Sequence, residues 1–212
     1  MTPPLARREG ARKKPRTKRA VRMLSPAQVC TAVKTMAAPS GTARFAAGKA
    51  LTVTAEKDPG RVYLHFDVIA ALLESASKIV RWNALQIVGS LASVDTERKL
   101  DARLDTYLGF IRGNNLISAA NAIQGAGRIA RCRPDLLDRI IPAILDVEQA
   151  TYETAECRNV AIGHALDVLH ELGPSVCRRA DVAGFIRRQR TNTRAAVARS
   201  AERMTADLVR GP

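Results

Sequence analysis

Trp82-Asn83-Ala84 is followed in the chain by Ala120-Asn121-Ala122 and then by Arg158-Asn159-Val160. The asparagines are 38 residues apart both times, and one more step toward the N-terminus reaches Arg44-Phe45-Ala46. A period near 40 residues that holds two helices is typical of a helical solenoid. One such hairpin cannot bury both of its apolar faces, so the repeat predicts a stack of hairpins.

The spacing of apolar residues and chain breakers predicts ten helices. Ser25-Pro26 combines a capping hydroxyl with proline at the first helical position, which is a helix start. Breaks fall at Asp58-Pro59-Gly60, Gly113-Asn114, Arg133-Pro134 and Gly173-Pro174. The expected helices are 26–37, 42–56, 61–76, 78–93, 96–112, 115–131, 134–149, 154–172, 175–189 and 192–209.

Helical rather than extended periodicity runs through these segments. In 96–112, one stripe gathers Leu100, Leu104, Tyr107, Leu108 and Ile111. The chain is 46% hydrophobic but only 4% aromatic, a composition that suits helices packed on small side chains. The sequence therefore predicts an all-α fold, an α-α superhelix of about four helical hairpins with capping helices.

These motifs resemble the HEAT and armadillo class over about residues 42–189. The spacing of Arg81, Ala84 and Leu91 is similar to the first helix of a HEAT unit. Three segments further resemble a group of prokaryotic HEAT-like proteins without an assigned activity: 78–82, 89–95 and 156–165. The resemblance implies a surface that presents itself to a partner, but a shared fold does not by itself assign a function.

The net charge of +14 is concentrated at the two ends of the chain. Residues 1–24 have a net charge of +8 and residues 178–212 of +6, whereas residues 25–177 are electroneutral. The first segment is basic and contains proline with little to bury, so we expect a disordered basic tail over 1–24 and a repeat domain over 25–212.

No pattern in the sequence indicates catalysis, a cofactor or a metal. There is neither a glycine-rich phosphate loop after a strand nor a nucleophile elbow. His164, Asp167 and Glu171 share one helical face, but no second histidine accompanies them, so a solvated polar face is expected. The four cysteines form no CxxC pair, and no apolar run approaches about 18 residues. We expect a non-enzymatic, cytoplasmic protein.

The recurring asparagines Asn83, Asn121 and Asn159 are the first candidates for a binding site, together with Arg81 and Arg158. A row of side-chain amides can pair with the main chain of an extended peptide, because an amide offers both a donor and an acceptor. The same row can instead join neighbouring repeats. Because both sets of connections are short, the sequence leaves open which helices line the concave side.

The basic ends suggest a second function. A flexible arm rich in Lys and Arg can bind nucleic-acid phosphates without sequence specificity, and the C-terminal helices add further arginines. The sequence thus favours a scaffold that binds a protein or peptide partner, with a nucleic-acid-associated protein as the alternative; it leaves the oligomeric state open. The candidate tail residues are Arg12, Lys13, Lys14, Arg16, Lys18 and Arg19.

Overall fold

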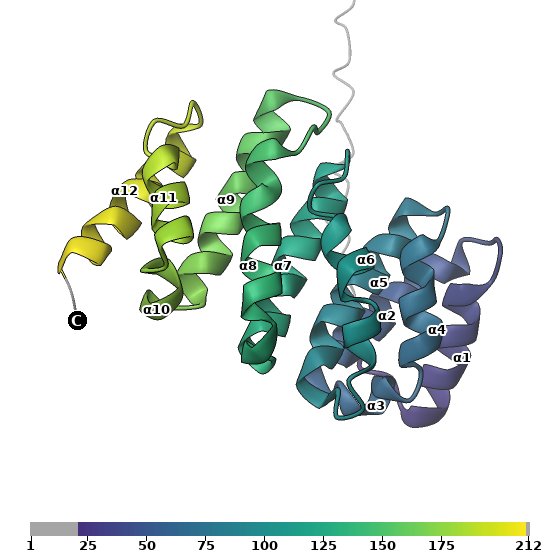
Figure 1. Cartoon of the computed structure of the whole chain (residues 1–212). Helices are drawn as coiled ribbons and strands as arrows, with labels where there is room; N and C mark the ends of the chain where they lie inside the picture. Colours follow the sequence, from purple (N-terminus) through teal and green to yellow (C-terminus); the bar gives the residue numbers. More distant parts are fainter. Residues whose placement is uncertain (1–20, 211–212) are drawn as a thin grey trace, which may run out of the picture.

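The computed structural model describes residues 21–210, and all regular structure in that range is helical. The helices form a one-dimensional array that runs from α1 at one end to α12 at the other (Figure 1). The expectation of an all-α superhelix is confirmed.

One layer of the array consists of long, uninterrupted helices. Each contacts the next in the series, so the layer is continuous from the first to the last. These helices are α2 (Ala43–Lys57), α5 (Lys78–Leu91), α7 (Leu116–Cys132), α9 (Ala155–Glu171) and α12 (Ala195–Arg210).

The second layer is built from shorter pieces that return the chain between the long helices. Each segment predicted as one helix over 61–76, 96–112, 134–149 or 175–189 is divided in the structure. The pieces are α1 (Pro26–Ala37), α3 (Gly60–Tyr63), α4 (Phe66–Ala71), η1 (Leu72–Glu74), η2 (Ala92–Val94), η3 (Lys99–Ala102), α6 (Leu104–Gly109), η4 (Pro134–Leu136), α8 (Leu137–Leu145), η5 (Asp146–Gln149), α10 (Pro174–Cys177) and α11 (Ala180–Gln189).

Glycines let the long helices approach closely. A Cβ atom on Gly89 of α5 would lie 2.8 Å from the Cα of Gly125 on α7, and one on Gly127 would lie 2.6 Å from Val168 Cγ1 on α9. Contacts between successive second-layer helices, such as α6 with α8, are sparser.

A single apolar core fills the space between the two layers. The stripe predicted in 96–112 is buried throughout, with Leu100, Leu104, Tyr107 and Ile111 fully inaccessible to solvent. The core continues from Val29 in the first helix to Met204 in the last. No part of the array therefore has a separate core of its own, which is expected of stacked repeats.

Candidate partner-binding surface

The long helices α5 and α7 present matched stripes of side chains on the face that leaves the core. Positions along each stripe are separated by four and three residues in turn, the spacing of one helical face. Each residue on α7 lies 38 positions after its counterpart on α5, and none is fully buried. The stripes are Ile79, Asn83, Gln86 and Ser90 on α5, continued by Ser93 in η2, and Ile117, Asn121, Gln124, Arg128 and Arg131 on α7.

Two isoleucines begin these stripes and remain accessible to solvent. Ile79 is 40% exposed and Ile117 is 48% exposed, and both occupy the first turn of their helix. Trp82 lies between the two helices, half-buried, with Nε1 donating to Ser118 Oγ over 3.0 Å. The stack thus leaves an isoleucine uncovered at the same position in two successive repeats.

The recurring asparagines join one repeat to the next. Asn83 Oδ1 accepts from Thr52 Oγ1 on α2 over 3.4 Å, and its Nδ2 donates to Ile79 O. Asn121 Oδ1 accepts from Gln86 Nε2 on α5 over 3.0 Å. Within residues 21–210 no hydrogen bond involves the Nδ2 of Asn121.

Asn159 continues the row toward the C-terminal end. Its Nδ2 donates to Thr193 Oγ1 over 2.9 Å, and its Oδ1 accepts from Asn192 Nδ2 over 3.2 Å. All three asparagines are half-buried, so each retains some solvent access while it holds an adjacent repeat.

The two candidate arginines differ in their hydrogen bonds and exposure. Arg81 folds back on its own loop, where Nη1 donates to Ser75 O over 2.6 Å and Nε is buried without a partner. Arg158 is exposed near the start of α9, and no ion pair involving it occurs within residues 21–210. Within residues 21–210 no hydrogen bond joins Arg81 or Arg158 to the recurring asparagines.

Cations appear where the stripes end. Arg128 Nη1 donates to Gln86 O and Ser90 Oγ, both over 3.4 Å, and so bridges α7 to α5. Arg131 forms a 2.9 Å ion pair with Glu171 on α9. These contacts compensate part of the charge and tie the row together across three repeats.

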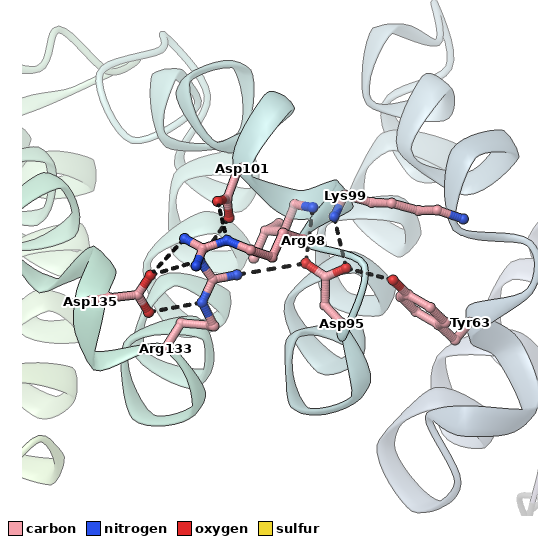
Figure 2. A network of polar contacts seen from close by, with 8 residues as sticks. Tyr63, Asp95, Arg98, Lys99, Asp101, Arg133 and Asp135 are labelled. Carbon is pink, nitrogen blue, oxygen red and sulfur yellow. Dashed lines mark hydrogen bonds and ion pairs between the residues drawn. The ribbon is translucent and has the colours of Figure 1, made fainter.

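A separate polar network closes the corner between repeats, and sequence patterns did not indicate it (Figure 2). Asp95 is fully buried and accepts from Tyr63 Oη over 2.6 Å and from the main-chain nitrogens of Lys99 and Leu100. Burial, followed by the bond to Asp95, raises the pKa of Tyr63 to about 12. Each of these bonds joins two groups within the corner, so the network stabilises the fold.

Arg133 extends this network to the next repeat. It forms 2.8 Å ion pairs with Asp101 and Asp135, and Arg98 contacts the same two carboxylates over 2.9 and 3.0 Å. The bond from Arg133 lowers the pKa of Asp135 to about 2. The arginines thereby hold the α5–α6 corner against the α7–α8 corner.

The remaining sequence candidates are placed as follows. His164 is half-buried and lines a surface hollow with Asp167 and Arg203. Among residues 21–210, no three His, Cys, Asp or Glu side chains are grouped in a way that could hold a metal ion. In the same range no helix is long and apolar enough to cross a bilayer. Outside the described residues lie Arg12, Lys13, Lys14, Arg16, Lys18 and Arg19.

Similarity to solved structures identifies the fold of the chain. No protein-family model matches the chain, and no curated protein matches it either. Among solved structures, a designed armadillo repeat protein in complex with the peptide (KR)4 is similar with a TM-score of 0.62 and 14% identity, over 85% of this chain and 81% of that one. The fold is an armadillo- and HEAT-type superhelix.

A second similar structure is a mutant of Kap121p. Its TM-score is 0.59 at 15% identity, over 86% of this chain. The superhelix matches only 21% of the length of Kap121p. Both likenesses therefore concern how the helices are stacked, and the sequence-based resemblance to HEAT and armadillo repeats is confirmed at that level.

Proposed function

We propose that this superhelix is a non-enzymatic scaffold that binds an extended segment of a protein partner across α5 and α7. The observation that carries the proposal is the pair of uncovered isoleucines, Ile79 and Ile117, at equivalent positions in successive repeats. One turn farther on, Asn83 and Asn121 supply amides, and Asn121 has free donors for a peptide carbonyl. Trp82 adds an aromatic edge between the two helices.

The charges on α5 and α7 indicate what kind of peptide they can bind. Neither α5 nor α7 contains an acidic residue, whereas Lys78, Arg128 and Arg131 are cationic. A peptide with dense positive charge would find no carboxylate on these two helices. Of the acids that border them, Glu171 is already paired with Arg131, and Glu56 lies beside Arg128. The partner segment should therefore carry apolar side chains that cover the isoleucines and should be neutral or acidic at the end that faces Arg128.

Peptide selection tests this function directly. A random library displayed on phage is selected on the full chain, and the affinity of an enriched peptide is measured for variants. We expect Ile79→Glu combined with Ile117→Glu to weaken binding about tenfold or more, because each uncovered isoleucine would contribute about 1 kcal/mol when the peptide covers it.

The chain offers a matched control on its other layer. Leu64, two residues before α4, is 87% exposed, and Val68, within α4, is 46% exposed. Both lie away from the stripes. Leu64→Glu combined with Val68→Glu introduces the same charges and should leave affinity unchanged. Equal losses in both double variants, or a selection that enriches no peptide, would contradict the proposed function.

Two finer inferences accompany this function. We infer that the protein acts in the cytoplasm, which fits cysteines that form no paired motif. We also infer kinship with prokaryotic HEAT-like proteins, which rests on the segments 78–82, 89–95 and 156–165. A structure-guided search that recovers these segments only in unrelated solenoids would remove that kinship.

A further inference from the structure

The last helix of the stack carries a row of arginines on the face opposite its core contacts. Val197, Ala201 and Met204 are the buried residues of α12. At 3.6 residues per turn, the arginine row lies on the other side of the helix, within a narrow sector of about 40°. Its members are Arg199, Arg203 and Arg210, all exposed.

These arginines are not engaged by neighbouring acids. In the C-terminal region the ion pairs involve other arginines: Arg179 with Asp138 and Asp181, Arg188 with Glu148, and Arg194 with Glu156. No ion pair within residues 21–210 involves the exposed arginines Arg178, Arg187, Arg190, Arg199, Arg203 and Arg210.

Two acids flank the row without neutralising it. Glu202 and Asp207 are exposed on α12 and lie on either side of the arginine sector, and neither takes part in an ion pair in the described chain. Residues 178–212 retain a net charge of +6. The end of the superhelix is therefore cationic, in contrast to the electroneutral segment between residues 25 and 177.

We propose that this row binds the phosphate backbone of a nucleic-acid duplex. The three arginines extend about 16 Å along the helix at 1.5 Å per residue. Each strand of a duplex presents one phosphate charge per about 3.4 Å of its axis, so about five phosphates of one strand lie along the length of the row. The inference does not rest on the peptide-binding function, because α12 is remote from α5 and α7 in the stack (Figure 1).

The composition of the row favours a polyanion over a protein partner. Protein interfaces are built around apolar and aromatic residues, with charge depleted at their centre. The apolar side chains that border the sector of Arg199, Arg203 and Arg210 are two alanines, Ala196 and Ala206. With no aromatic side chain beside the arginines to stack on a base, contact is confined to the backbone, and affinity should hardly depend on sequence.

The test compares salt dependence in the full chain. Binding to two unrelated 20-base-pair DNA duplexes is measured by fluorescence anisotropy at several salt concentrations. The variant combines Arg199→Gln, Arg203→Gln and Arg210→Gln. We expect its log–log salt slope to be flatter than that of the wild type by about 2 to 3, since each lost phosphate contact contributes about 0.9.

A control removes the same number of charges from the other end. Lys34, Lys49 and Lys57 are exposed on α1 and α2, and no ion pair involves them in the described part of the chain. Replacing all three with Gln should leave the slope within about 0.5 of the wild type if the contact is local to α12. A variant with Lys at the three row positions should keep the wild-type slope, because the slope depends on the number of positive charges that contact phosphates.

Several outcomes would overturn the proposal. The row is excluded if its Gln variant matches the lysine control, or if deletion of residues 1–20 abolishes binding that the Gln variant retains. Capture by phosphatidylserine vesicles without capture by either duplex would assign the row to a lipid surface. Unchanged duplex binding together with self-association of the Gln variant would identify the row as a polar cap on the stack.

Discussion

The hydroxyl of Tyr107 occupies the tightest point between two long helices. It donates to Leu85 O over 2.8 Å and is fully buried. A Cβ atom on Gly125 would lie 1.7 Å from this oxygen, so an alanine there displaces the tyrosine and breaks its bond. Gly163 on α9 recurs 38 residues later, but a Cβ there meets only Val197 Cγ2 at an ordinary 3.5 Å.

We therefore expect opposite effects from two identical substitutions. Gly125→Ala should lower the free energy of unfolding by about 2 to 4 kcal/mol, through overpacking and a lost buried hydrogen bond. Gly163→Ala should be neutral or stabilising by up to about 1 kcal/mol, because alanine favours the helix. Urea titrations followed by circular dichroism measure both; equal effects would show that the close approach at Gly125 is not real.

The asparagine positions illustrate what a repeat period can predict. The 38-residue interval located Asn83, Asn121 and Asn159 correctly on corresponding helices, since a period in sequence becomes a period in space. Their partners carry no such period. Thr52 and Gln86 occupy different steps of their helices, so only the relative placement of adjacent repeats reveals which side chain each amide meets.

Ile79 and Ile117 were overlooked because each reads as one more apolar residue in an amphipathic helix. Their recurrence at 38 residues was a usable signal, but only burial distinguishes an uncovered isoleucine from a core one.

At the level of elements, Asp95 and Arg133 determine where two repeats meet. Asp95 accepts from the first main-chain nitrogens of η3. Arg133, whose side chain is only 12% exposed, reaches Asp101 from the following repeat and also pairs with Asp135 of its own repeat. This corner also explains why the predicted helix 96–112 is divided. Arg98 adopts a left-handed φ of 57°, which a continuous helix does not permit, and the chain restarts on the Asp95 cap.

The network should make stability depend on pH in a defined window. The folded pKa of Asp135 is about 2, below the ordinary 3.8, so its contribution is fully present above pH 3.8 and is lost as pH falls through about 2. Arg133→Gln should lower the free energy of unfolding by about 1 to 3 kcal/mol at pH 7. The difference in Tm between wild type and variant should then shrink between pH 3.8 and 2.

Arg139→Gln provides the comparison for this titration. Arg139 pairs with Asp105 across an exposed surface over 2.7 Å, and such pairs contribute about 0 to 1 kcal/mol. Thermal melts of both variants over pH 2 to 7 separate the two cases. A constant difference for Arg133→Gln across this range would show that the ion pairs do not stabilise the fold.

Across the whole molecule, the two layers differ in how well the sequence predicts them. The long helices were predicted within a few residues of their observed limits because their apolar periodicity is uninterrupted and breakers flank them. The second layer was predicted less well, since its short pieces are set by caps and corners formed with other repeats. How closely α5 and α7 approach is set by glycine contacts such as that of Gly89 with Gly125.

If the exposed stripes of α5 and α7 form the binding surface, the side-chain amide signals of these stripes report peptide binding directly. In a two-dimensional nitrogen–proton NMR spectrum, a selected peptide is titrated into the labelled full chain. We expect the side-chain amide signals of Asn83, Gln86, Asn121 and Gln124 to shift with the added peptide, while the main-chain signals of α4 and α6 stay in place. Shifts confined to the second layer, or saturating binding with these four amides unmoved, would contradict this binding surface.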